Sequence, residues 1–207
     1  MDIYDKKGNK LTTGCVDSPY DCRDYTLACG AVNMPKNFQL VMPPVKNQFA
    51  SPTCVAFSTS YVNEYYHSKV DQYIPFSTQF IYGYRPNGYY IGDGMVIRDA
   101  LKTILKVGNV CAEDCIGNSS NVEDAIEDVK KKESELIAKA EPYKITSYCR
   151  VESINDIKTA LLSGMPILAS MNWYNQSFLK DGIYVYNEEY GYGRHCITIY
   201  GSFFIPF

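Results

Sequence analysis

The stretch VKNQFASPTCVAFS, residues 45–58, places a glutamine and a cysteine on either side of a short loop, directly before an apolar run. Within the loop, serine is a common N-cap residue and proline is favoured at the first helical position. We therefore predict a helix start at Ser51-Pro52-Thr53, with Ser51 as the N-cap and the helix continuing from Cys54 to about His67. Apolar residues lie on most sides of this helix, which predicts that it is buried at the centre of the fold.

Cys54 would lie near the positive end of the dipole of that helix, roughly three residues from its start. A thiol is a nucleophile only as the thiolate, and a helix N-terminus favours that form. The alternative interpretation is that Cys54 is a small buried hydrophobic residue, which is the commonest role of a cysteine.

The chain has two histidines that could serve as the base, His67 and His195. On the same helix as Cys54, His67 would be roughly 20 Å from the sulfur. His195 opens a later strand and could reach the thiol, take its proton and later protonate a leaving amine. A hydrogen-bonded structural histidine at a strand end is the alternative.

Gln48 precedes Cys54 by six residues. Its side-chain amide, beside the backbone N–H of Cys54, would form an oxyanion hole for a tetrahedral intermediate. A single glutamine in a loop is usually only solvated, so the combination of Gln48, Cys54 and a distant His195 carries the hypothesis.

The composition is that of a globular protein, with 207 residues, 46% hydrophobic residues, 21% charged residues and a net charge of −3. The scattered lysines and arginines exclude the basic stripe of a nucleic-acid binder. No apolar run approaches the length of a membrane span, and MDIYDKKGNKLTTG at the N-terminus has no apolar signal-peptide core. We expect a reducing cytoplasm, with a virion or a host cell as further settings, and no membrane or nucleic-acid partner.

The eight cysteines are expected to be free thiols in such a compartment. Cys15, Cys22 and Cys29 recur every seven residues, and Cys111 and Cys115 form C-x3-C. Neither spacing matches the C-x2-C pair of a zinc site. We therefore expect no metal and no cofactor.

The order of the expected elements predicts an α+β fold, because helices come first and strands later. An N-terminal arm, residues 1–35, precedes a helical lobe, residues 36–118, and a strand-rich lobe, residues 119–207. The expected elements are a short helix within 74–85 ending at Gly83, an amphipathic helix within 93–108 ending at Gly108, a charged surface helix within 119–142, a helix capped by Ser153 and Asp156, and strands at 165–173 and 193–201.

These segments together resemble the papain-like cysteine peptidases. VKNQFASPTCVAFS is similar to their active-site segment, with Gln48 and Cys54 at the oxyanion and nucleophile positions, and GYGRHCITIYG is similar to their histidine segment, with His195 as the base. IPFSTQFIYGYR, SINDIKTALLSGMPILASM and the opening TTGCVDSPYDCRDYTL resemble further family segments, the last one as found in bacterial and phage-type members.

The resemblance implies two lobes, a helical one carrying the cysteine and a barrel-like one carrying the histidine, with an extended peptide substrate in the cleft between them. By position, Gly94 and Met95 would line the non-primed side, Cys196 would touch the S2 pocket, and Trp173 and Arg194 would border the primed side. For Met95 and Trp173 the alternative is an ordinary core position.

The sequence departs from the family pattern in several places. Ser51 replaces a disulfide-forming cysteine, and Val55 replaces the tryptophan after the nucleophile. Only 53 residues precede Cys54, so control would come from the short arm, a partner or confinement. The twelve residues after His195 contain no Asn, Asp or Glu, so the orienting asparagine and the last barrel strands are missing. Either the chain is truncated, or another residue or subunit takes that role.

The sequence thus predicts a thiol endopeptidase that hydrolyses peptide bonds through an acyl-enzyme on Cys54, weakened by the missing asparagine. Its partners would be a peptide or protein substrate and an inhibitor or partner subunit. Two alternatives stay open: an inactive papain-like module with an interaction or structural role, such as a virion component, and another Cys–His acyl-transfer enzyme, such as a transglutaminase or amidase. Of the eight thiols, Cys54 is expected to react fastest with electrophiles near neutral pH.

Overall fold

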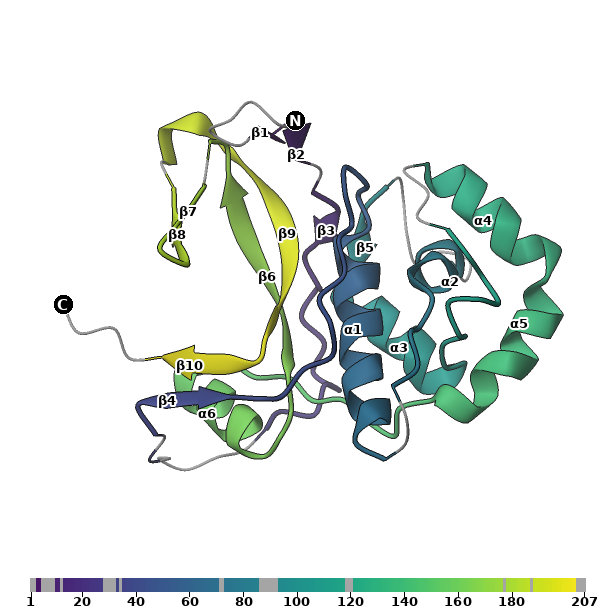
Figure 1. Ribbon diagram of the computed structural model, residues 1–207, viewed down its shortest axis with the longest axis horizontal. Helices are drawn as coiled ribbons and strands as arrows, with labels where there is room; N and C mark the ends of the chain where they lie inside the picture. The colour runs from purple at the N-terminus through teal and green to yellow at the C-terminus, as the bar shows by residue number, and fades with distance from the viewer. Residues whose placement is uncertain are drawn as a thin grey trace.

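The computed structural model describes residues 3–4, 10–11, 13–27, 33, 35–70, 73–85, 93–117, 121–176, 178–186 and 188–203. Most of the helices gather in one lobe and most of the strands in the other, with part of the N-terminal arm between them (Figure 1). The fold is α+β, as predicted, and the described strands form no closed barrel.

The helical lobe is built around helix α1, Cys54–Ser68, which has ten buried residues. Around it lie α2, Thr78–Gly83, and α3, Ile97–Lys106. The predicted N-cap is wrong: Thr53, not Ser51, is the N-cap, so Cys54 is the first helical residue. The hydroxyl of Ser51 instead donates to the Gln48 carbonyl at 2.6 Å, which closes the loop before the helix.

The charged segment that was predicted as one helix forms two, α4, Val122–Lys131, and α5, Glu133–Ala140, followed by a 3₁₀ turn, η1, Glu141–Tyr143. Lys132 interrupts the helix, with φ −127° and ψ 19°. The apolar stripe of these helices is buried in the same core as α2 and α3, through Ala125, Val129, Leu136 and Ala140. The segment in which the sequence placed the lobe boundary therefore packs with the helical core.

The strand-rich lobe centres on a long antiparallel pair, β6, Ile167–Tyr174, and β9, Tyr192–Ile199. Shorter pairs flank it: β7, Phe178–Lys180, with β8, Ile183–Val185, and β4, Asn37–Gln39, with β10, Gly201–Phe203. A 3₁₀ turn, η2, Glu188–Tyr190, precedes β9. The predicted capping box at Ser153 and Asp156 is confirmed at the start of α6, Ile154–Leu162.

The described part of the chain ends in a strand. Phe203 closes β10, whereas residues 204–207 lie outside the described residues.

The N-terminal arm contributes β1, Ile3–Tyr4, β2, Lys10–Leu11, and β3, Cys15–Val16. The β3 strand pairs in parallel with β5, Met95–Val96, which directly precedes α3. The first residues of the segment predicted as the helix at 93–108 are therefore a strand. In Figure 1 the β3 segment runs between β9 and α1, so the arm enters the space between the two lobes.

In the part of the chain that the structure describes, no helix has the length and apolar character needed to cross a bilayer. The same residues contain no cluster of three or more His, Cys, Asp or Glu side chains that could hold a metal ion.

Candidate active site

Cys54 lies at the N-terminus of α1, at the boundary between the lobes. Its side chain is 1% exposed, and its thiol contacts backbone groups of Cys196 and Gly14. One turn later, the Ser58 hydroxyl donates to the Cys196 carbonyl at 3.3 Å. These contacts hold the start of α1 against β9 beside His195.

The loop before Cys54 is fixed by its own hydrogen bonds. The Gln48 amide nitrogen, Nε2, donates to the Ser51 carbonyl at 3.0 Å. Phe49 adopts a positive φ of 51°, and its N–H donates to the Asn47 side chain at 2.8 Å. This geometry keeps the Gln48 amide folded toward the segment that leads to Cys54.

A buried ion pair anchors the same loop to α1. Lys46 pairs with Glu64, whose side chain is fully buried, and also donates to the Phe76 carbonyl at 2.9 Å. Glu64 in turn accepts the Phe76 N–H at 2.7 Å. Burial raises the pKa of Glu64, and the contact with Lys46 opposes that rise.

His195 lies on β9, opposite Met171 of β6. Its ring packs edge-on against Trp173 at 5.3 Å between centroids, and Trp173 also contacts Tyr184 at 4.8 Å. Among the described residues, no carboxamide or carboxylate is hydrogen-bonded to the imidazole. The neighbouring carboxamide of Asn172 accepts from Arg194 instead, at 2.7 Å.

Burial changes the charge state of both predicted catalytic groups. It raises the pKa of the Cys54 thiol to about 11, although backbone hydrogen bonds oppose the shift. It lowers the pKa of His195 to about 4. Both groups are therefore neutral near pH 7. Burial therefore opposes the activation that the helix dipole predicted for Cys54.

The described side chains of Cys54 and His195 are not hydrogen-bonded to each other. Cys196 links the two residues: it follows His195 on β9, and its backbone contacts the Cys54 thiol.

The N-terminal arm covers this site and contacts four of the five predicted substrate-binding residues. A methyl group on Gly94 would lie 2.5 Å from the Val16 side chain, and the Met95 N–H donates to the Gly14 carbonyl at 2.8 Å. On the opposite side, the Asp17 carboxylate accepts from Arg194 Nε at 3.0 Å, and the Cys15 thiol contacts the Cys196 thiol.

Gly14 of the arm lies against the nucleophile loop. A Cβ at this position would lie 1.9 Å from the Pro52 carbonyl oxygen, so only glycine lets the two backbones approach.

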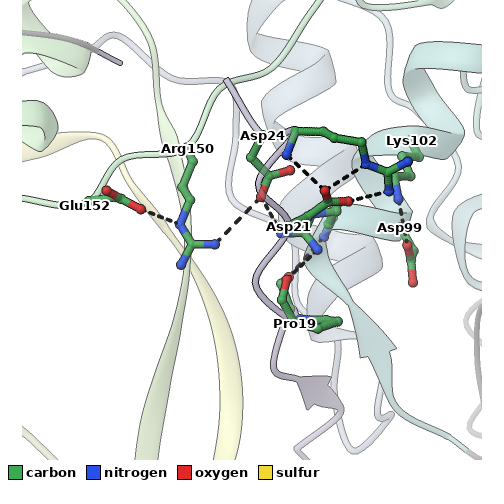
Figure 2. A network of polar contacts seen from close by, with 10 residues as sticks. Pro19, Asp21, Asp24, Asp99, Lys102, Arg150 and Glu152 are labelled. Atoms are coloured by element: carbon green, nitrogen blue, oxygen red, sulfur yellow. Dashed lines mark hydrogen bonds and ion pairs between the residues drawn. The ribbon is translucent and has the colours of Figure 1, made fainter. Parts of the chain in front are cut away.

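The arm is held at its far end by an ion-pair network between the lobes (Figure 2). Arg98 of α3 donates to the Pro19 carbonyl at 2.5 Å and pairs with Asp24. Arg150 lies 3.7 Å from the same Asp24 carboxylate, and its backbone exchanges hydrogen bonds with Tyr25 and Leu27. Figure 2 shows Asp24 between Arg150 and the α3 side of the network.

A cavity of about 570 Å³ lies beneath this network, between α3, α6 and the β6–β9 sheet. Its walls are mainly apolar, with Ile97, Leu101, Ile167 and Ile199 among them, and Asp24 and Arg98 lie on its rim. The size is within the range of small-molecule or side-chain binding pockets.

A helix-borne buried cysteine, a preceding glutamine and a histidine on the facing strand, with one lobe on each side, match a known family. The family model described as papain family cysteine protease matches residues 31–202. The chain belongs to the papain family of cysteine proteases. No curated protein matches the chain.

Solved structures of this family share the fold. Xylellain, a cysteine protease from Xylella fastidiosa, is 22% identical over 95% of this chain and 81% of its own, with a TM-score of 0.78. Procathepsin B S9 from Trypanosoma congolense is 15% identical over 92% of this chain and 70% of its own, with a TM-score of 0.63. The cysteine protease and lectin-like domains of Cwp84 from Clostridium difficile are 18% identical over 92% of this chain and 43% of their own, with a TM-score of 0.63.

In this papain-family chain, sequence reasoning named the short arm as one source of control but did not place residues 14–17 against the site. The signal lies in the segment that begins at Gly14, which contains small and acidic residues and comes before the predicted helical lobe. It could not show where the arm runs, because its partners, such as Gly94 and Arg194, are distant in sequence.

Proposed function

We propose that this papain-family cysteine protease is an endopeptidase that hydrolyses peptide bonds through an acyl-enzyme on Cys54. The observation that carries the proposal is the arrangement at the lobe boundary. Cys54 begins α1, its thiol contacts the backbone of the residue that follows His195, and the extended arm strand β3 lies between α1 and β9 (Figure 1). A substrate peptide would take the place of that strand.

The roles follow from the chemistry of these side chains. Once the arm leaves and water enters, burial no longer keeps the Cys54 thiol and the His195 imidazole neutral. A proton can then pass from Cys54 to His195. The thiolate attacks the scissile carbonyl, and the imidazolium protonates the leaving amine. Water then attacks the thioester, with His195 as the base, and releases the acid.

The oxyanion formed in each step would be stabilised by two N–H donors. The first is the backbone N–H of Cys54, which belongs to the first helical turn and has no acceptor within the helix. The second is the Gln48 amide, which carries two N–H groups. Its hydrogen bond to the Ser51 carbonyl supports this role, because that bond fixes the amide beside the nucleophile loop.

Turnover by the 207-residue chain should be slow. Packing of Trp173 against His195 restrains the ring, but among the described residues no carboxamide orients it. In serine triads, loss of the orienting residue costs up to about 10⁴ in kcat. The cost should be smaller here, since a thiolate–imidazolium pair partly orients itself.

The test combines a peptide substrate with covalent labelling. Fluorogenic peptides should be cleaved slowly, and a small epoxide should add to Cys54 at a low rate near neutral pH. The Cys54→Ala variant should lose both, whereas Cys149→Ala, which removes an exposed thiol, should keep both. A family-like C-terminal extension bearing asparagine should raise kcat without moving the label. Turnover that survives Cys54→Ala would overturn the proposal.

A further inference from the structure

Three buried thiols from distant parts of the chain meet in the covered cleft. Cys15 comes from the arm, Cys54 from the start of α1, and Cys196 from β9, and all three belong to one buried core cluster. The proposed hydrolysis uses only Cys54. Cys15 and Cys196, with 7% and 3% of their surfaces exposed, are left without a role.

The contacts between the arm and β9 place Cys15 opposite Cys196. Asp17 pairs with Arg194, and Cys15 contacts Cys196. Two residues toward the C-terminus along the arm therefore match two residues toward the N-terminus along β9. Because side chains on one face of a strand repeat every two residues, the two segments run antiparallel, with both pairs between them. Ser170, which lies opposite Cys196 on β6, also contacts the Cys15 thiol.

This placement suits a disulfide. The Cys15 and Cys196 thiols are in contact, and both residues lie in one buried core cluster. A disulfide needs Cβ atoms about 3.5–4.5 Å apart, with Cα atoms about 4.4–6.8 Å apart. A small closing movement of the arm would therefore bring the Cys15 and Cys196 sulfurs into bonding range.

We propose that Cys15 and Cys196 form a redox-active pair that reacts with small-molecule disulfides of the glutathione type and locks the arm across the active-site cleft. The inference concerns regulation of the proposed peptidase site and rests on that function for its effect on activity. The disulfide itself depends only on the placement of the two thiols.

The exchange is a two-step reaction. When the arm lifts, the Cys15 thiolate attacks one sulfur of the small disulfide, forming a mixed disulfide and releasing one small thiolate. When the arm closes, Cys196 gives up its proton, attacks the Cys15 sulfur and displaces the second small thiolate. Two protein thiols are oxidised, one small disulfide is reduced, and the two protons end on the two small thiols released.

Cys15 is the attacking group because it moves out with the arm, whereas Cys196 stays on β9. While the arm is closed, the hydrogen bond from the Cys196 thiol is the main cause of the lowered pKa of Cys15, and the pKa of Cys196 is raised. Cys54 is the third thiol of the cluster, but its hydrogen-bonding contacts are with backbone groups of Gly14, Val55 and Cys196. A link between Cys15 and Cys196 leaves Cys54 chemically intact beneath a fixed arm.

The experiment uses the full chain in buffers of defined ratios of reduced to oxidised glutathione. After trapping with iodoacetamide, non-reducing digestion and mass spectrometry identify the linked peptides. We expect a Cys15–Cys196 pair, two hydrogens lighter than the separate peptides. Labelling of Cys54 by a small epoxide should slow at least about tenfold in the oxidised chain and recover with dithiothreitol.

Two variants separate the lock from general oxidation. Cys15→Ser should keep Cys54 labelling insensitive to oxidised glutathione. Cys22→Ser, which removes the next, exposed cysteine of the arm, should leave the lock intact. A Cys15–Cys54 link, a glutathione adduct that stays on Cys15, or unchanged Cys54 labelling after oxidation would overturn the inference and leave the peptidase proposal standing. Loss of peptide cleavage and Cys54 labelling under all conditions would overturn the peptidase proposal, whereas the linkage map would still decide the inference.

Discussion

The Asp17 carboxylate of the N-terminal arm is bound to Arg194, the residue that directly precedes His195, with 3.0 Å between Arg194 Nε and Asp17 Oδ1. This contact joins the arm to the strand that carries the proposed base. It also lies at the surface, where Asp17 is 64% and Arg194 37% exposed. The arm is therefore held partly by a bond that solvent and salt can weaken.

Loss of this ion pair should loosen the arm. We expect Asp17→Asn to speed epoxide labelling of Cys54 about two- to fivefold, the range for a partly exposed ion pair. The effect should shrink at high salt, because screening weakens the wild-type pair. The matched control is Asp21→Asn, because Asp21 bonds to Arg23 within the arm itself. Equal effects of the two variants would show that Asp17 does not hold the arm to β9.

Trp173 should keep His195 neutral. Burial lowers the pKa of His195 to about 4, and Trp173 packs on its ring. In Trp173→Ala, water should reach the imidazole, and its pKa should rise toward the ordinary value of about 6.5. NMR titration of the histidine signals measures this directly, with His67 as the internal reference. A His195 titration that Trp173→Ala leaves unchanged would argue against this shielding.

Lys46 should be far more important for stability than a surface lysine. Lys46→Met leaves the buried Glu64 carboxylate without its cation, which should lower the free energy of unfolding by about 3 kcal/mol. Lys139→Met, which removes exposed pairs with Asp114 and Glu135, should cost about 0.5 kcal/mol. Urea unfolding of the two variants tests this difference.

The Lys46→Met deficit should also depend on pH. The folded-state pKa of Glu64 is raised, so the stabilisation from its protonated form is complete below the ordinary pKa and is lost as pH rises through the folded-state pKa. Protonated Glu64 carries no charge and does not need Lys46 as a partner. The deficit should therefore be smaller near pH 4 than near pH 7. An equal deficit at both pH values would contradict the assignment of Glu64 as the buried partner.

Local sequence signals predicted much of the fold because they act over a few residues. The capping box at Ser153 and the long strands that contain Trp173 and His195 were predicted correctly. The N-cap at Ser51 was wrong because the serine hydroxyl bonds the Gln48 carbonyl, which closes a loop before the helix starts. A propensity for the N-cap cannot express that competition.

The state of the site could not be predicted from the same signals. That Cys54 reacts fastest of the eight thiols stays a prediction, but its burial and its raised pKa of about 11 were not expected. The reason is the arm, whose contacts with Gly94 and Arg194 join residues about 80 to 180 positions apart. Burial of this kind depends on tertiary packing, and no spacing within one segment indicates it.

The most direct test is the pH dependence of Cys54 alkylation in the wild type and in Gly14→Ala. A Cβ on residue 14 would clash with the Pro52 carbonyl oxygen at 1.9 Å, so the variant should displace the arm from the nucleophile. In the wild type, the rate should stay low at pH 7 and rise toward a pKa of about 11. In Gly14→Ala, the rate at pH 7 should be at least about tenfold higher, with the profile moved to lower pH. Identical profiles, or a Cys54 that reacts rapidly at pH 7 in the wild type, would contradict a covered papain-family active site.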